Sequence, residues 1–470
     1  MIVSKEDFTK YSLLSCDKNF NQNFGFFVRL LRRSRLPFLK TNRLFMSAIQ
    51  MNMVRHLSYF QECVRKTKKE VKEASSVKDK DFSNQKMLIL KEWIRVFQTI
   101  TDGIAWRNLK FNRPIIRLMS ENNSVGHMGK EEVDIYTSYL RHSREFIIIN
   151  DLTRCLRISD ITKILSNGKV VLLELKKSGK LQNDVLRVAA KMKKNKRFFT
   201  KQELKQWVAQ WAIIDNKITV PLLKNGVVSN NLKAEIISSD IDIKNHFSKI
   251  RQLIKSAKKN GYSQEEVEEG YFIKVIFWDR YFVESEKNDD YQIKYGSKPG
   301  WIKNNKKILN FSNYDSFRQE EGQYTRNIIP YSVLPFSSKD AVYLMMGHIF
   351  IEEFINLDLF KKRFENDGWQ VKEPDIFCAD KYEPIKEMNK FEDMDKYDRA
   401  EEQYVLSKSI DGNRYFCEMP FTLVLIMMTS FYKIDFLIDA ANFLFSRKDN
   451  CNSKSHPYTI NFAKEYKNLI

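Results

Sequence analysis

The feature that most constrains the fold is a pair of short apolar runs joined through Ser166-Asn167-Gly168. The runs are Ile158–Leu165 and Lys169–Lys176. An Asn-Gly pair between alternating apolar runs is a strong signal for a β-hairpin. The chain is therefore expected to contain a local antiparallel sheet, and the length of its loop decides which side chains share a face.

Two loop lengths are compatible with this segment, and they differ in where they place Asp160. A two-residue loop pairs Asp160 with Leu175, so that the Asp160 side chain faces away from Glu174. A three-residue loop, Ser166–Gly168, places Asp160 opposite Glu174. The last residue of a three-residue loop favours the left-handed region, which suits Gly168. We therefore predict the three-residue loop.

Helical and strand patterns surround the hairpin. A helix is predicted at Glu131–Ser143 and a strand at Phe146–Ile149, both before the hairpin. A basic helix follows at about Asn183–Lys196. Farther on, a helix at Asp242–Asn260 leads into an apolar strand at Tyr271–Trp278. This succession of periods predicts a mixed α/β protein.

Length and composition set the domain organisation. The chain has 470 residues, 43% of them hydrophobic, with only 15 Gly and 10 Pro, which favours helix-rich α/β structure in about two to four domains. We expect a helical, basic N-terminal region over residues 1–100 and a central domain over 101–283. A C-terminal α/β or helical domain over 308–470 follows the polar segment 284–307, and within it Ala341–Phe360 is predicted to be one helix.

Charge, cysteine spacing and the longest apolar run limit the partners, metals and cellular location that we expect. Lys and Arg (79) outnumber Asp and Glu (59), which gives a net charge of +20 and favours a polyanionic partner, most often nucleic acid. Six scattered Cys without a CxxC pair argue against structural zinc and a disulfide framework. The longest apolar run, Phe421–Tyr432, is too short to cross a bilayer. We expect a cytoplasmic protein with no membrane partner.

Asp160, Glu174 and Lys176 form the candidate catalytic group. Alternation along a strand puts Glu174 and Lys176 on one face, and the predicted loop brings Asp160 opposite Glu174. Two carboxylates and a nearby carbonyl can hold a hard divalent cation such as Mg²⁺. A lysine beside them can orient a water nucleophile or stabilise charge that develops on a phosphate.

The order helix, strand, strand with Asp160, strand with Glu174-Leu175-Lys176, helix resembles the PD-(D/E)XK, or restriction-endonuclease-like, nuclease superfamily. The resemblance covers residues 101–280 and implies an αβββαβ core in the central domain. It implies phosphodiester hydrolysis with Mg²⁺, which Mn²⁺ can replace. Carried over, Asp160, Glu174 and the Leu175 carbonyl are metal ligands and Lys176 is the catalytic lysine. Ser159 stands where the superfamily name has Pro.

Many members of the superfamily add a glutamate from the preceding helix. Glu132 is the candidate, because it shares a helical face with Tyr136 and Leu140. Glu131 is its rival, and Asp102 is a weaker alternative acid.

Two functions follow as expectations. The first is a nuclease that acts on DNA rather than RNA, with Arg187, Lys191 and Lys194 of the basic helix on phosphates; the resemblance adds a role in bacterial defence against phage. The second is an inactive nuclease fold that binds nucleic acid or a partner protein, with the acidic stretch Glu392–Glu402 as a docking segment. Cleavage of a duplex often needs two sites, which a homodimer or a partner subunit would supply.

Overall fold

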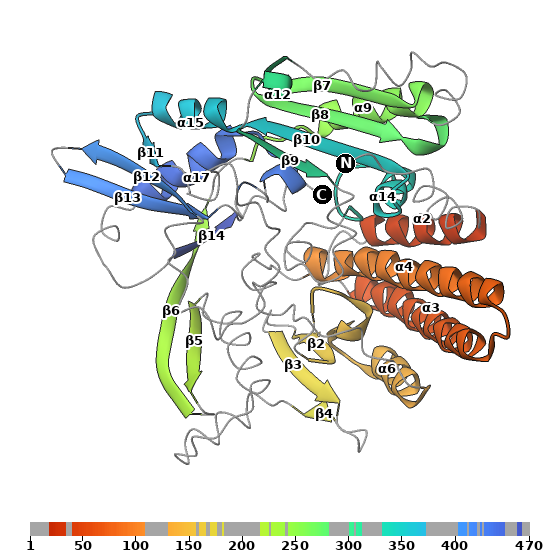
Figure 1. The fold of residues 1–470 in the computed structure, drawn as a ribbon. Helices are drawn as coiled ribbons and strands as arrows, with labels where there is room; N and C mark the ends of the chain where they lie inside the picture. The colour runs from red at the N-terminus through yellow and green to blue at the C-terminus, as the bar shows by residue number, and fades with distance from the viewer. Residues whose placement is uncertain are drawn as a thin grey trace. The chain divides into compact units, whose positions relative to one another are not determined.

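The computed structural model describes the chain in ranges, which are 18–33, 40–108, 130–156, 159–165, 170–175, 181–182, 217–224, 227–239, 243–281, 300–304, 307–312, 331–372, 403–410, 413–420, 424, 427–446 and 458–462. The chain divides into two compact units. Unit 1 comprises Met1–Asp240, Gln319–His348 and His456–Ile470, and unit 2 comprises Ile241–Arg318 and Ile349–Ser455. Both units mix helices with small, mainly antiparallel sheets (Figure 1).

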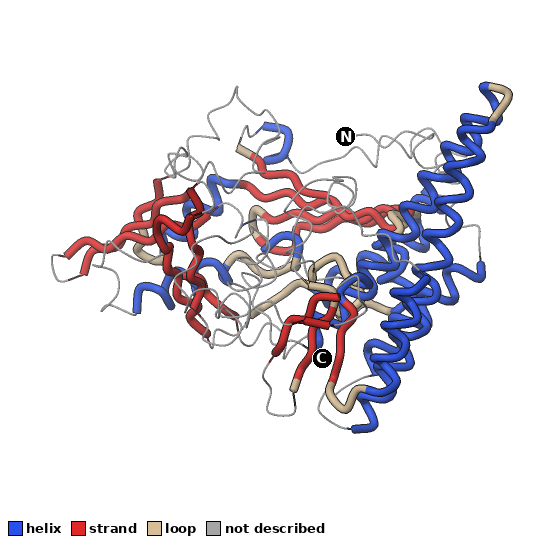
Figure 2. The backbone as a smooth tube through the Cα atoms, turned by 90° about the horizontal axis from the view of Figure 1, so that it is seen from below, coloured by secondary structure: helices blue, strands red, loops and turns tan. Residues whose placement is uncertain are grey.

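Unit 1 begins with a helical bundle. Its described helices are α2 (Lys18–Arg33), α3 (Lys40–Glu73) and α4 (Val77–Asn108), and α14 (Ser338–Met345) packs on α2. The helices α3 and α4 lie side by side as a long hairpin (Figure 2). Aromatic rings fill the bundle: the centroid of Phe97 is 5.7 Å from that of Phe24 and 6.1 Å from that of Phe60.

Ser76 sets the turn between the two long helices. Its Oγ accepts the backbone N–H of Asp79 at 3.1 Å and donates to Asp79 Oδ2 at 2.6 Å. A serine bonded to an acid three residues later is the reciprocal arrangement of a helix N-cap, which satisfies amides that the first turn leaves without partners. The α3–α4 hairpin therefore has a defined turn and a defined α4 start.

The predicted hairpin lies in a small sheet of unit 1. Within the described ranges the strand order is β1-β2-β3-β4, with every neighbouring pair antiparallel. The strands are β1 (Phe146–Ile149), β2 (Ile161–Ile164), β3 (Val170–Leu175) and β4 (Leu181–Gln182), preceded by α6 (Lys130–His142). The helix before the sheet and the strand β1 agree with the sequence prediction.

The pairing of β2 with β3 has the predicted register. Ile161 pairs with Leu173 and Ile164 with Val170, which is the register that a three-residue loop requires. The loop itself lies outside the described residues. A second small sheet of unit 1 has the order β14-β6-β5, with β14 parallel to β6; its strands are β5 (Lys217–Lys224), β6 (Val227–Ser239) and β14 (Tyr458–Phe462).

Unit 2 is built on a sheet whose described strands have the order β7-β8-β10-β9. They are β7 (Tyr262–Glu268), β8 (Tyr271–Phe277), β9 (Ile308–Ser312) and β10 (Ile349–Asn356). The amphipathic helix α9 (Phe247–Asn260) packs on β7 and β8. The remaining described elements are α12 (Gly300–Asn304), α15 (Leu357–Asn366), β11 (Gln370–Lys372), β12 (Gln403–Ile410), β13 (Asn413–Pro420) and α17 (Asp435–Ser446).

The prediction of one helix over Ala341–Phe360 is wrong. The segment forms the end of α14, then the strand β10, then the start of α15. Gly347 adopts φ 76°, a left-handed conformation that ends the helical region. All eight residues of β10 are buried, including the polar Glu352, Glu353 and Asn356, and a segment without alternation does not distinguish a buried strand from a buried helix.

No helix within the described ranges is long and apolar enough to cross a lipid bilayer.

Candidate functional site

The helical bundle supports the edge of the β1–β4 sheet. The side chain of Gln50, fully buried on α3, donates from Nε2 to the carbonyl of Ile147 at 2.7 Å and accepts the N–H of Ile149 at 3.0 Å. These are the two backbone groups that an edge strand leaves open. The amide of Gln50 thus replaces a neighbouring strand, and it ties β1 to α3.

Asn150, the first residue of the short 3₁₀ helix η1 (Asn150–Leu152), organises the segment that carries Asp160. Its buried Nδ2 donates to the carbonyl and to the Oγ of Ser159, each at 2.8 Å, and its Oδ1 accepts from Thr162 Oγ1 at 2.8 Å. One amide therefore holds the residues on both sides of Asp160. Ser159, where the superfamily name has Pro, acts here as a hydrogen-bond partner of Asn150.

Asp160 is half-buried just before β2. Its carbonyl accepts the N–H of Asn150 at 2.9 Å, and its N–H donates to the carbonyl of Leu173 at 3.1 Å. Because Leu173 is already paired with Ile161, two successive residues face one residue of β3, which is the arrangement of a β-bulge. The bulge therefore places Asp160 beside Leu173, the residue that precedes Glu174 on β3.

Tyr136, which lies on α6 with only 1% of its surface exposed, bonds to one carboxylate and is affected by the charges of two others. Tyr136 Oη donates to Asp151 Oδ2 at 2.6 Å. Burial raises the pKa of Tyr136 well above its ordinary value, and the negative charges of Asp151, Asp160 and, more weakly, Glu132 raise it further. The tyrosine therefore remains a neutral hydrogen-bond donor. Asp160 and Glu132, two acids predicted from the sequence, therefore both raise the pKa of the same tyrosine.

Two residues of this group had no role in the sequence prediction. Asp151 was not singled out, and Tyr136 was noted only for sharing a face with Glu132. The clue to Asp151 is its place immediately after an apolar strand. Glu131, the rival of Glu132, is exposed, and it is not among the charges that act on Tyr136.

The other predicted site residues are only partly described. The backbones of Glu174 and Leu175 lie in β3, where they pair with Gln182 and Leu181 of β4, but their side chains are outside the described part. Lys176 and the basic residues Arg187, Lys191 and Lys194 lie entirely outside it, as does Glu392–Glu402. Among the side chains that are described, no group of three or more His, Cys, Asp and Glu could hold a metal ion.

Asp102, the weaker alternative acid, holds the backbone that follows η1. Its Oδ1 accepts the backbone N–H groups of Arg154 at 2.6 Å and of Cys155 at 3.0 Å. Burial raises the pKa of Asp102, and the charge of Arg154 together with the two N–H donors opposes that shift. Gln98, one turn earlier on α4, donates to the carbonyl of Asp151 at 3.4 Å. The helix α4 thus fixes the chain on both sides of Leu152.

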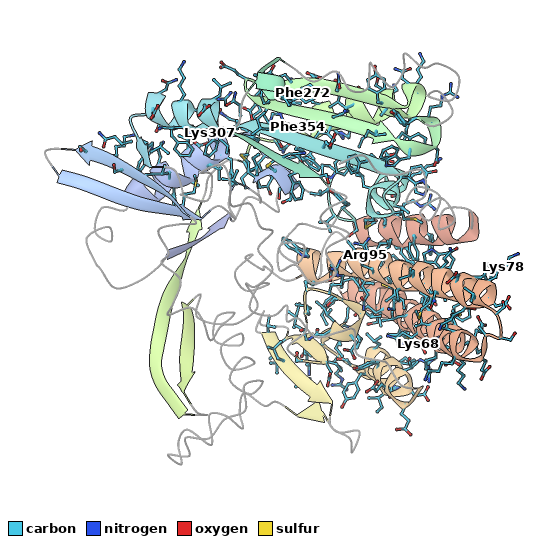
Figure 3. All side chains as sticks on the ribbon, viewed as in Figure 1. Lys68, Lys78, Arg95, Phe272, Lys307 and Phe354 are labelled. Atoms are coloured by element: carbon cyan, nitrogen blue, oxygen red, sulfur yellow. The ribbon has the colours of Figure 1, made fainter. Side chains whose placement is uncertain are left out.

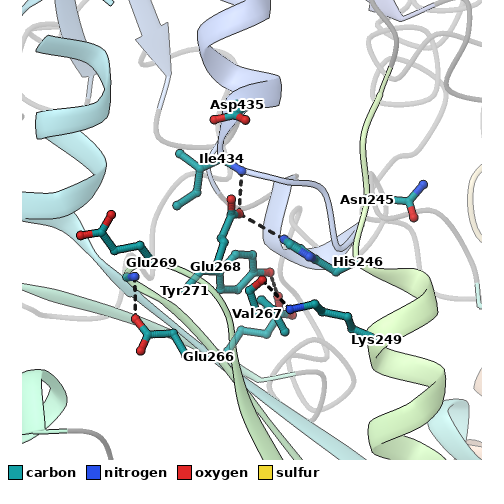
Figure 4. Close-up of polar contacts among 12 residues, drawn as sticks. Asn245, His246, Lys249, Glu266, Val267, Glu268, Glu269, Tyr271, Ile434 and Asp435 are labelled. Carbon is teal, nitrogen blue, oxygen red and sulfur yellow. Dashed lines mark hydrogen bonds and ion pairs between the residues drawn. The ribbon is translucent and has the colours of Figure 1, made fainter. Parts of the chain in front are cut away.

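Unit 2 contains a separate cluster of ionisable groups around Glu268, at the end of β7 (Figure 4). Glu268 Oε1 lies 3.1 Å from His246 Nε2 and accepts the N–H of Ile434 at 2.9 Å, and its Oε2 pairs with Arg363 at 3.0 Å. Arg363 also reaches Asp435 at 3.3 Å. Burial raises the pKa of Glu268, but the hydrogen bonds and positive partners outweigh it, and its net pKa lies below the ordinary value.

A second acid of unit 2, Glu353, is fully buried on β10 and accepts a hydrogen bond from the hydroxyl of Tyr271. Burial raises the pKa of Glu353 well above its ordinary value, with the Tyr271 bond opposing the shift. The ring of His246 meets that of Tyr271 edge to face at 5.3 Å. His246 is 2% exposed, and the cluster joins α9, the sheet, α15 and the start of α17.

The comparisons with known proteins leave the family open. The chain matches no protein-family model, and it has no significant similarity to a curated protein or to a solved structure.

Proposed function

We propose that unit 1 is a metal-dependent nuclease that hydrolyses phosphodiester bonds, with DNA as the expected substrate. The observation that supports this is the hydrogen bond from the Asp160 N–H to the carbonyl of Leu173, the residue before Glu174 on β3. The chain order of α6, β1, β2 and β3, a helix followed by three antiparallel strands, is compatible with the start of the expected nuclease core.

The residues proposed to hold the metal are oxygen donors. The carboxylates of Asp160 and Glu174 and the carbonyl of Leu175 are the type of ligand that Mg²⁺ prefers. A bound Mg²⁺ would polarise the scissile phosphate and neutralise developing charge. The positive charge of Lys176, two residues beyond Glu174 on the same strand face, would orient the attacking water.

Glu132, Asp151 and Tyr136 extend the proposed site. The Tyr136 hydroxyl holds the Asp151 carboxylate in one orientation, and the charges of Glu132 and Asp160 act on the same hydroxyl. A cation bound at the neighbouring Asp160 would reduce the mutual repulsion of these carboxylates. A cluster that carries this much negative charge is consistent with a cation partner.

The test is cleavage of supercoiled and linear DNA with Mg²⁺ or Mn²⁺. Asp160→Asn, Glu174→Gln and Lys176→Ala should each lower the rate by about 100-fold or more, because each removes a group from the charge-stabilising site. Glu132→Gln should also slow cleavage, whereas Glu131→Gln, one residue away, and Lys163→Ala on β2 should leave the rate within about twofold.

A second candidate is the inactive scaffold. It is favoured by the net charge of +20, which attracts nucleic acid whether or not the chain cleaves it. Under this alternative, wild type and Lys176→Ala bind DNA equally and neither cleaves it. Cleavage that all variants retain would contradict the nuclease site proposed here.

A further inference from the structure

One side of the α3–α4 hairpin is buried near β1 and becomes exposed and basic toward the turn at Ser76. On α3, Gln50, Val54, Leu57 and Gln61 recur at the three- and four-residue spacing of one helical face, and all four are buried. Gln50 is the residue that bonds to β1, and α6 packs on the same helix. Toward the tip of the hairpin, the turn at Ser76, the same helical face of α3 presents the exposed Lys68 and Lys72. We call this face the α3 line and the corresponding face of α4 the α4 line.

The second helix repeats the pattern in the opposite chain direction. Asp102 and Gln98 of α4 bond to the backbone on either side of Leu152. The same face of α4, followed toward the tip, presents Lys91 and Lys80, both exposed. These two positions precede Gln98 by 7 and 18 residues, which corresponds to about 10 and 27 Å of helix.

The two lines lie on one flank of the hairpin. The Gln50 face of α3 and the Gln98 face of α4 both bond to the β1–η1 segment. Residues 18 positions apart are five helical turns apart and share a face, so Lys68 and Lys80 lie on that same side of the hairpin. The ion pair between Lys86 and Glu70, at 2.9 Å, marks the opposite flank. We name the set Lys68, Lys72, Lys80 and Lys91 the lysine flank. Figure 3 labels Lys68 on α3 and Arg95 on α4.

Charges are segregated between the two flanks. No acidic residue occurs on either line between Gln61 and the tip or between the tip and Gln98. Within the described part of the chain, the four lysines have no ion-pair partner, whereas Arg65, beside the α3 line, pairs with Glu62. Unpaired lysines aligned on one side create a local positive potential that a solvated, salt-bridged helix lacks.

We propose that the lysine flank binds the phosphate backbone of a nucleic acid duplex and leads it toward the Asp160 site. The proposal rests on the proposed function, and it adds that the substrate is a duplex long enough to reach both surfaces. The flank begins where α3 and α4 hold β1 and η1, so it is continuous with the elements that carry Asp151 and Asp160. Lys91 and Lys80 are 11 residues apart, about 17 Å of helix, which is half of one turn of duplex DNA, about 34 Å.

Lysines bind phosphates as mobile point charges without reading bases. The flank is therefore expected to contribute affinity and salt dependence but no sequence preference. An anionic membrane would also attract it, because the exposed Val77 and Leu88 lie near its outer edge. The duplex is favoured, since the flank adjoins the acids of the candidate site.

The experiment measures binding of a 30-base-pair duplex by fluorescence anisotropy from about 50 to 300 mM NaCl, without divalent metal. The test variant replaces all four lysines of the flank by Gln, which has a similar helix propensity. Each lost phosphate contact lowers the slope of log K against log salt by about 0.9, so the slope should fall by about 3 to 4. The matched control replaces Lys66, Lys69, Lys78 and Lys86 by Gln, and its slope should change by less than about 1.

An equal change in both variants would overturn the proposal, because net charge alone would then explain binding. Failure of the wild type to bind the duplex would overturn the proposal too. So would a four-lysine variant that loses binding to phosphatidylserine vesicles but binds the duplex as the wild type does. Asp160→Asn separates the two proposals: it should bind with the wild-type slope even though it does not cleave. A protein that never cleaves but shows the flank-specific slope would refute the nuclease and support the binding surface.

Discussion

At the scale of single residues, the buried polar side chains decide how the candidate site is held. Asn150 bonds to Ser159 and Thr162, and Tyr136 bonds to Asp151. Neither role could be predicted from the sequence, because the partners of a buried polar group are set by tertiary contacts. The register that positions Asp160 could be predicted, because it depends only on a local loop.

Glu268 gives a pH-dependent prediction for unit 2. Its native pKa lies below the ordinary value, which is about 4.3 for Glu in an unfolded chain. The stabilisation is therefore fully present above about pH 4.3 and is lost as the pH falls through the native pKa. Glu268→Gln should lower the free energy of unfolding by about 1–3 kcal/mol at pH 7, because hydrogen bonds to a charged group are lost.

The measurement is chemical denaturation at pH 7 and at pH 3, followed by circular dichroism. The difference between wild type and Glu268→Gln should be smaller at pH 3 than at pH 7, because pH 3 lies below the pKa of an unfolded Glu and part of the stabilisation is already lost. Glu269→Gln, at the exposed next residue, is the control and should stay within about 0.5 kcal/mol of wild type at both pH values. A difference that grows on acidification would show that the sign argued here is wrong.

At the scale of elements, local signals predicted the antiparallel hairpin well and the C-terminal elements poorly. The register of β2 with β3 follows from the turn residues, and α6 and β1 follow from their own periodicities. The strand β10 was missed because both of its faces are buried, so its residues show no alternation. Contacts distant in the chain, such as that of Gln50 with β1, leave no periodic signal.

The two hydrogen bonds between Gln50 and β1 are expected to stabilise that strand. Gln50→Leu keeps the volume of the side chain but leaves the carbonyl of Ile147 and the N–H of Ile149 buried without their partner. Each such group costs about 1–3 kcal/mol, so the variant should lose about 2–4 kcal/mol. Hydrogen exchange of the Ile149 amide should accelerate strongly. Gln85→Leu, at an exposed position of α4, should change neither quantity; unchanged Ile149 exchange in Gln50→Leu would contradict the role of the amide.

At the scale of the whole molecule, the chain assigns different tasks to its two units. The acids around Tyr136 and the lysine flank both belong to unit 1. In unit 2, the acids Glu268 and Glu353 bond to neighbouring side chains and to the backbone. A metal that binds the proposed site should therefore act on unit 1 alone.

Amide hydrogen exchange with mass spectrometry tests this division. A ligand that binds only the native site stabilises it by about 2.7 kcal/mol at 100 times its dissociation constant. With Mg²⁺ at that level, exchange in β1, β2 and β3 should slow by up to about 100-fold, while β8 and β10 of unit 2 should not change. The protection should vanish in Asp160→Asn and persist in Glu131→Gln. Equal protection of both units, or protection that survives Asp160→Asn, would place the cation elsewhere, because neither result follows from a metal held between Asp160 and Glu174.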